Sequence, residues 1–207
     1  MELFEAIAAR GSKRKYQCEP VPPDVIRKCI EAAGQAPSPH NDQMWKFIVV
    51  SNDGLKSKMA SEVEAELDRL FAKVDSKSDI VRQVRWYSTF FRDAPVVVAC
   101  LMKPYISTIT PVLQQMEMDP EQVNEKRGRP DYQAMGAAIQ NMLLAATALD
   151  YGTCWLSGPI VARKGIEAVL GVEPPWKLVA LVSLGKPDGD IKQAPKKPLG
   201  EIFEIRD

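Results

Sequence analysis

The chain has 207 residues, with 27 basic and 27 acidic side chains, one histidine and four cysteines. This length suits one domain that buries a sizeable core without metals or disulfides, and 45% apolar and 26% charged residues argue against global disorder. A formal net charge of zero argues against nucleic acid or an anionic membrane surface as the main partner.

The N-terminal part is expected to alternate short helices with turns. Apolar residues at helical spacing predict an amphipathic helix over residues 2–9, which is followed by a basic turn at 10–16. A second helix is predicted from Pro23 to Gly34, with the proline in its first turn. Residues 36–43 contain too many turn formers for regular structure and lead into a strand at 46–50, which we expect to be buried.

The middle of the chain predicts two helices, one buried strand and a long excursion. Residues 55–71 form a heavily charged helix that we expect to lie outside, and residues 80–91 form a second helix with an aromatic end. The β-branched run at 94–101 predicts a strand buried on both faces. Residues 103–131 have no clean period and contain several prolines, so we expect a long excursion with a few helical turns, of the kind that is usually functional or mobile.

The C-terminal part begins with the longest apolar helix, at about 133–149, which is flanked by small residues that permit close packing. A short strand at 153–156, a helix at 162–170 and a last strand at 178–184 follow. The tail places two lysines before an extended segment.

Strands separated by helices predict a single α+β domain over residues 1–207, in which helices cover a small sheet. Only three or four strands are evident, which is few for a free-standing sheet, so an extra strand from elsewhere, such as a partner's tail, would complete it. The N-terminus carries acids where a signal peptide would carry bases, and the longest apolar runs are about half of a membrane span. We therefore expect a cytoplasmic protein.

Side chains that perform catalysis by themselves are scarce. The chain contains no phosphate-binding P-loop, no G-x-G-x-x-G after a strand and no G-x-S-x-G elbow, and His40 would have to serve any Ser or Cys nucleophile. One histidine excludes a His-rich metal site, and cysteines without a C-x-x-C pair disfavour a zinc knuckle or a disulfide framework. Such a chain either lacks an activity or takes its chemistry from a cofactor.

Two basic segments are candidates for binding an anion. The turn at 10–15 has four bases and a serine in six residues, and guanidinium groups with a hydroxyl and local N–H groups suit a phosphate. The alternative is a solvated charge cluster. The lysine pair Lys196-Lys197 carries a weaker signal, and its alternative is a solvated tail.

Two further segments are candidates for contact with a planar ligand. On the loop at 37–45, Ser38, Asn41 and Gln43 offer donors and acceptors to a heterocycle; alternatively, the segment is only a turn anchored by Trp45. The segment 152–158 has glycines near both ends, which either allow close backbone approach to a ligand or only end a helix and a strand.

In this order the segments resemble the nitroreductase family of FMN-dependent oxidoreductases. Residues 10–14, RGSKR, are similar to the family's R-R-S-x-R opening, with Gly11 in place of the second arginine. Residues 36–50, APSPHNDQMWKFIVV, look like A-P-S-x-x-N-x-Q-P-W-x-F-x-V-V, with Met44 in place of proline. Further matches lie at 93–98, 136–155 and 196–202, so the resemblance covers nearly the whole chain apart from residues 52–85 and 103–131.

The resemblance implies an intertwined homodimer with two FMN sites at the subunit interface, each lined by both chains. The helix at about 133–149 would lie at the dimer core, and the C-terminal segment would embrace the partner and extend its sheet. Arg10, Ser12 and either Lys196 or Lys197 would contact the FMN phosphate, and Arg14 would lie near the N1/O2 edge of the flavin. The remaining implied contacts are to the ring, the ribityl chain and the region of N5, and they come from Pro37, Ser38, Pro39, Asn41, Ser157 and Gly158.

The resemblance also implies the activity: hydride passes from NAD(P)H through FMN to a small acceptor such as a nitroaromatic or a quinone, in ping-pong fashion, without a metal or a catalytic side chain. Alternatives are a flavin-dependent dehalogenase or a flavin-fragmenting enzyme on the same scaffold, a flavin-binding protein with low turnover, and a scaffold without ligand. We expect the excursion at 103–131 to set substrate choice, either as a lid or as a loop packed on the partner, and His40 either to reach a substrate or to be an ordinary loop residue. The lid candidates are Tyr105, Met116, Met118 and Tyr132.

Overall fold

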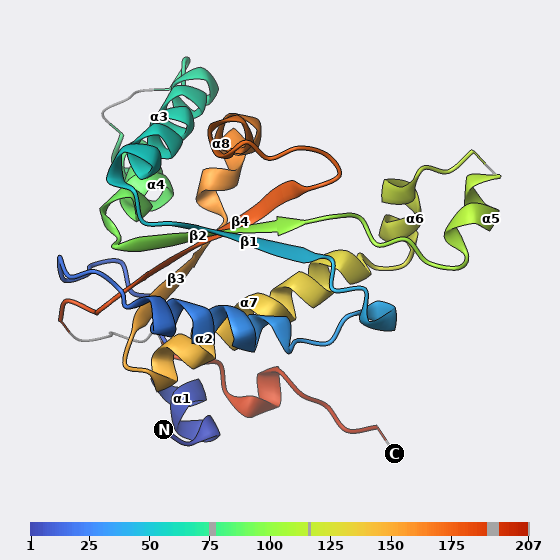
Figure 1. Cartoon of the computed structure of the whole chain (residues 1–207), viewed down its shortest axis with the longest axis horizontal. Coiled ribbons are helices and arrows are strands. Elements are labelled where there is room, and N and C mark those ends of the chain that lie inside the picture. The colour runs from blue at the N-terminus through green and yellow to red at the C-terminus, as the bar shows by residue number, and fades with distance from the viewer. Residues whose placement is uncertain (75–77, 116, 190–194, 207) are drawn as a thin grey trace.

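The computed structural model describes residues 1–74, 78–115, 117–189 and 195–206 (Figure 1). At its centre is a sheet with the order β1-β2-β4-β3, in which all neighbouring strands of this order are antiparallel. Its strands are β1 (Trp45–Val50), β2 (Val96–Met102), β3 (Gly152–Leu156) and β4 (Lys177–Gly185). Helices cover both faces of this small sheet, which confirms the predicted α+β fold class.

One face of the sheet is covered by α2 (Pro23–Gly34) and α7 (Pro130–Ala148), with α1 (Leu3–Ala9) beyond them (Figure 1). Ala138, Ile139 and Met142 of α7 are almost completely buried in the core on this side. The helix is apolar on nearly all sides, which is typical of a helix at the centre of a fold or at an interface.

The opposite face is covered by α3, α4 and α8, together with two short 3₁₀ turns that follow α4 and precede α8 (Figure 1). Charged residues predict that the first of these helices lies outside; it forms the outer layer, but Met59, Val63 and Leu67 are fully buried along its inner side. The bounds are α3 (Asp53–Leu70), α4 (Asp79–Thr89), η2 (Phe90–Asp93), η3 (Gly158–Ala162) and α8 (Arg163–Leu170).

The central and edge strands differ in burial. In β2 every residue is buried, and successive side chains enter the two cores in turn, which confirms a strand buried on both faces. The expectation of a buried β1 is wrong, because this strand lies at the edge of the sheet and its Lys46 and Val49 are exposed.

The excursion after β2 contains two short helices, α5 (Thr110–Gln114) and α6 (Pro120–Lys126), as the sequence predicts. Figure 1 shows them projecting at one end of the molecule, beyond the start of α7. A capping box between Asp119 and Gln122 begins α6, and Arg129 in the left-handed conformation connects it to α7.

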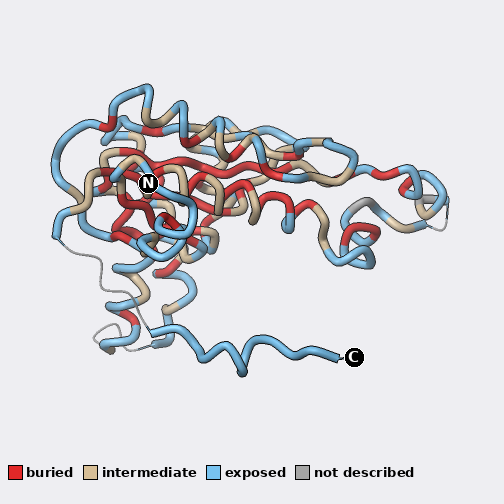
Figure 2. Tube along the Cα trace, turned by 90° about the horizontal axis from the view of Figure 1, so that it is seen from below, coloured by how far each residue is buried: buried red, intermediate tan, exposed pale blue. Residues whose placement is uncertain are grey.

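The C-terminal segment, residues 195–206, runs apart from the body of the chain (Figure 2). All of these residues are exposed, and the segment contains one 3₁₀ turn, η4 (Leu199–Glu201). Its exposed apolar side chains are Leu199, Ile202, Phe203 and Ile205. Within the described residues, no helix is long and apolar enough to cross a membrane.

Candidate functional site

The basic turn is attached to β3 by its own backbone. Ser12 pairs with Thr153 in a parallel bridge, and the Lys13 N–H donates to the Thr153 carbonyl over 2.8 Å. An extended backbone directs alternate side chains to opposite sides, so Ser12 is directed to one side and Lys13 to the other.

Three of the predicted phosphate and flavin residues gather around one thiol. Burial raises the pKa of Cys154, and the nearby Arg14, a hydrogen bond with Ser12 and the charge of Arg10 lower it in part. The backbone agrees with this, because Ser12 pairs with Thr153 directly before Cys154, and Arg10 and Arg14 are two residues away from Ser12 in sequence. The structure therefore brings Arg10, Ser12 and Arg14 together at one site.

Lys13, the other base within this stretch, is an anchor. It is buried, its ammonium donates to the carbonyl of Gly189, and its stem lies against the backbone of Gly152. A Cβ at Gly152 would lie 2.7 Å from Cγ of Lys13, so the glycine is required by this close approach. Tyr16 completes the anchor, because its hydroxyl donates to or accepts from Ser183 at 2.7 Å and lies 2.6 Å from the Lys13 carbonyl, to which it is hydrogen-bonded.

Arg14 extends along the surface over an aromatic ring. Its guanidinium carbon lies 5.2 Å from the centroid of Tyr87, within cation–π range, and its Nη1 donates weakly to the Ser12 carbonyl at 3.5 Å. Tyr87 is itself 41% exposed. The positive charge of Arg14 is thus held at the surface of the basic turn.

The loop at 37–43 has an unusual backbone. His40, Asn41 and Gln43 have φ angles of 51°, 54° and 45°, in the left-handed region that non-glycine residues seldom adopt. The loop is held by its own hydrogen bonds, including one of 3.0 Å from the Gln43 N–H to the Ser38 hydroxyl. Strained conformations of this kind cluster at ligand sites, where the surrounding structure holds them in place.

A cavity of about 320 Å³ lies between this loop and the first half of α7. It is lined by Pro37, Ser38, Pro39, Pro130, Gln133, Ala134 and Ala137. Small apolar and proline side chains with few polar groups suit a planar ring. Three predicted ring contacts, Pro37, Ser38 and Pro39, therefore line one cavity, and Asn41 is exposed on the same loop.

Ser157 and Gly158 lie where the chain leaves β3 for η3. A Cβ at Gly158 would lie 2.8 Å from the hydroxyl oxygen of Ser88, so close packing against α4 accounts for this glycine. Just before them, the exposed Trp155 lies against α7 at Gly136. This turn thus lies at the end of the edge strand β3 and packs against α4.

The predicted residues form separate groups in one chain. Figure 1 places η1 (Pro39–Asn41) near the start of α7, and α1, which leads into the basic turn, near its end. A helix of 19 residues is about 28 Å long, so the loop and the basic turn lie far apart. Lys196 and Lys197 lie on the exposed C-terminal segment, which runs apart from the body of the chain (Figure 2).

The comparison with known proteins decides the family. A profile of the Nitroreductase family matches residues 7–186. The chain belongs to this family.

Solved structures agree with this membership. A BluB-like flavoprotein from Clostridium difficile 630 is 33% identical, with a TM-score of 0.88 and full coverage of both chains. A protein described as a nitroreductase, in complex with FMN, from Desulfovibrio desulfuricans is 25% identical, with a TM-score of 0.70 and coverage of 100% of this chain and 98% of that one.

Curated relatives point in two directions. A protein described as an NAD(P)H nitroreductase, YfhC of Bacillus subtilis, is 28% identical and is matched over 97% of this chain and 92% of its own length. Iodotyrosine deiodinase of Nematostella vectensis is 25% identical and is matched over 99% of this chain and 75% of its own length.

The residues of this nitroreductase-family chain fit the cofactor that the resemblance implies. Two guanidinium groups and a hydroxyl suit a phosphate monoester, and the apolar cavity by α7 suits a flavin ring. Within the described residues, no group of three or more His, Cys, Asp or Glu side chains is arranged to hold a metal ion.

Sequence reasoning misplaced one residue of the excursion. Tyr105, a predicted lid residue, is only 1% exposed, because its ring belongs to the core and lies beneath the guanidinium of Arg127 at 5.1 Å. Its hydroxyl is hydrogen-bonded to Nδ1 of His40 at 2.5 Å. The pair is 65 residues apart in sequence, so no local pattern signals it.

The other lid candidates differ in exposure. Tyr132 is 40% exposed on the first turn of α7, and Met118 is half-buried. Met116 lies outside the described residues.

Proposed function

We propose that the protein binds FMN at two equivalent sites, each formed by two copies of the chain, and transfers hydride from NAD(P)H to a small acceptor such as a nitroaromatic or a quinone. One observation carries the proposal: the cluster of Arg10, Ser12 and Arg14 and the cavity beside the 37–43 loop lie at opposite ends of α7. Neither holds a whole flavin nucleotide by itself.

A twofold axis across α7 brings the two halves together. If two copies pack with their α7 helices antiparallel, the basic turn of one copy meets the 37–43 loop of the other, and the symmetry forms two such sites. The uncovered side of α7 supports this packing, because Gly136 and Ala137 are only half-buried and permit close approach.

Exposed apolar surfaces support the same pairing. Phe4 of α1 is 82% exposed, and Phe203 and Ile205 of the C-terminal segment are 54% and 71% exposed. Large apolar side chains exposed to this extent on a terminal helix and on a tail are expected at surfaces that a partner covers. In the proposed dimer the tail crosses the partner, adds to its sheet at the open edge of β1, and carries Lys196 or Lys197 to the phosphate.

FMN, when bound, supplies a ring that accepts hydride from NAD(P)H and delivers an electron pair to the acceptor. Arg10 and Ser12 bind its phosphate, and Arg14, held over Tyr87, places positive charge near the ring edge where reduction adds negative charge. The loop and α7 line the cavity that receives the ring, mostly with proline and alanine side chains. No side chain is needed as an acid or a base, and the excursion at 103–131 selects the acceptor.

Reductive dehalogenation is a second candidate, favoured by the similarity to iodotyrosine deiodinase. The two activities share the cofactor and differ in the acceptor that the excursion admits. An iodinated phenol and a nitroaromatic, offered separately to the reduced protein, distinguish them.

The first test is the visible spectrum of the purified protein and the mass of whatever denaturation releases. We expect a yellow dimer that releases FMN and oxidises NADH or NADPH rapidly when a nitroaromatic is added. A folded preparation that takes up no flavin from excess FMN would contradict the proposal. Tightly bound flavin without turnover would support FMN binding and would contradict the proposed enzymatic activity.

A further inference from the structure

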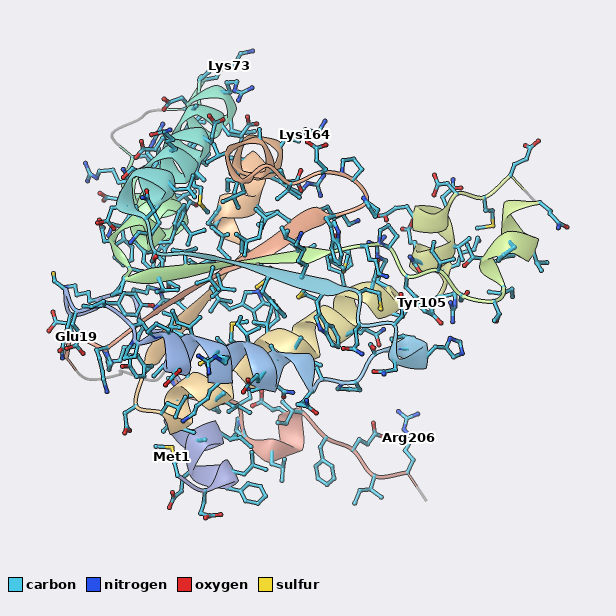
Figure 3. The ribbon with its side chains drawn as sticks, viewed as in Figure 1. Met1, Glu19, Lys73, Tyr105, Lys164 and Arg206 are labelled. Carbon is cyan, nitrogen blue, oxygen red and sulfur yellow. The ribbon has the colours of Figure 1, made fainter. Side chains whose placement is uncertain are left out.

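The excursion is fastened to the 37–43 loop at its base. His40 Nδ1 and the Tyr105 hydroxyl are hydrogen-bonded at 2.5 Å, and Nζ of Lys103 lies 3.4 Å from Oδ1 of Asp42. The Lys103 N–H also donates to the Met44 carbonyl over 3.0 Å. Figure 3 shows Tyr105 at this end of the molecule, near the start of α7.

The two partners of the central contact differ in rigidity. Tyr105 is 1% exposed and packed in the core, with Arg127 over its ring, so its hydroxyl has a fixed direction. His40 is exposed and occupies a left-handed backbone conformation, which residues other than glycine seldom adopt. A buried phenol needs a partner for its hydroxyl, and here the imidazole provides it.

We propose that Tyr105 is a positioning residue, whose hydroxyl holds His40 and through it the strained 37–43 loop in the conformation that receives the cofactor ring. This inference rests on the proposed function, since it acts on the loop assigned to that ring. Apparent affinity falls with the fraction of molecules in the competent conformation, so release of the loop weakens binding without removing a ligand contact.

The alternative is that Tyr105 has a purely structural role. In that case its ring packs in the core, and its hydroxyl contributes nothing to cofactor binding. Tyr105→Phe separates the two, because it keeps the ring and removes only the hydroxyl. His40→Asn approaches the same contact from the exposed side: asparagine tolerates the left-handed conformation but lacks the imidazole. Tyr151→Phe is the matched control, because its ring lies over the ammonium of Lys186 just beyond the other end of α7.

The experiment uses the full chain after bound flavin has been removed by dialysis. The protein is titrated with FMN at one fixed protein concentration, and binding is monitored by flavin fluorescence. We expect Tyr105→Phe and His40→Asn each to raise the Kd about fivefold, the effect of one net hydrogen bond. The double variant is expected to match either single variant, and Tyr151→Phe to match the wild type. The thermal midpoint should change little, whereas the visible circular dichroism of bound flavin should change, because the loop touches the ring.

Three results overturn the inference. A Kd for Tyr105→Phe within about twofold of the wild type does so, as do effects of the two substitutions that multiply in the double variant. If Tyr105→Phe does not fold, an unchanged Kd for His40→Asn is decisive in the same way. Wild-type protein that takes up no FMN overturns the proposed function and this inference together, whereas normal wild-type uptake with an unaffected Tyr105→Phe overturns this inference alone.

Discussion

The basic turn and the 37–43 loop are fixed by different physical means. The basic turn is paired with β3 through main-chain hydrogen bonds and carries charged heads at its surface. The loop has three non-glycine residues with positive φ and is held by hydrogen bonds that involve the hydroxyl groups of Ser38 and Tyr105. One region is suited to recognise charge and the other to recognise shape, so substitutions in them should differ in the ligands that they affect.

The largest expected effect is on charge recognition. Arg10→Ala should weaken FMN binding by roughly tenfold or more, because one charge-assisted phosphate contact contributes about 1.5–3 kcal/mol. Riboflavin, which lacks the phosphate, should bind as it does to the wild type. Parallel fluorescence titrations with both ligands measure this, with the exposed Arg27→Ala as control. Equal losses for the two ligands would show that the turn does not read the phosphate.

The anchor of the basic turn can also be disturbed by a substitution in β3, where Gly152 contacts the side chain of Lys13. Gly152→Ala places a Cβ 2.7 Å from the stem of Lys13, which cannot move away easily because it is buried. We expect a loss of about 1–3 kcal/mol in the free energy of unfolding, measured by urea denaturation. Gly34→Ala is the matched control, since no atom lies within 4 Å of its new Cβ. Equal stability of the two variants would mean that the turn is not anchored through Lys13.

A smaller effect is expected on shape recognition. Ser38→Ala removes the hydroxyl that accepts from the Gln43 N–H, and the loss of one such bond is about 1 kcal/mol, or roughly fivefold in binding. FMN and riboflavin should be weakened by the same factor, because the loop contacts the part that they share. An effect confined to FMN would contradict the division between the two regions.

The smallest effect is a pH-dependent one at the excursion beside the loop. Burial tends to raise the pKa of Glu121, but hydrogen bonds from Lys177 and Arg129 outweigh it, so the pKa is lowered overall. A lowered pKa in the folded protein stabilises it above the ordinary carboxyl value, and the contribution is lost as the pH falls. Glu121→Gln should therefore reduce stability by less than about 1 kcal/mol at pH 7, because the carboxylate is half exposed. Denaturation at pH 7 and pH 3 measures it; the same loss at both would exclude the ion pairs as the cause.

Much of the fold is readable from local pattern, since α2 carries a clear apolar period, β2 is a continuous β-branched run and α7 is a long apolar segment. The sequence misjudged β1 because burial depends on neighbours, and a hydrophobic strand at the edge of a sheet stays half exposed. Contiguous groups such as Arg10, Ser12 and Arg14 were predictable. The contact between His40 and Tyr105 was not, because it joins segments that meet only in three dimensions.

The length of α7 has a genetic consequence. In the proposed dimer each copy lends its basic turn to one site and its loop to the other. Consider a mixed dimer in which one subunit carries a defective turn and the other carries a defective loop. Both substitutions then fall in the same site, and the second site is intact. Two inactive variants should therefore complement each other to about half of the wild-type flavin content per mixed dimer, which no site contained within a single chain can do.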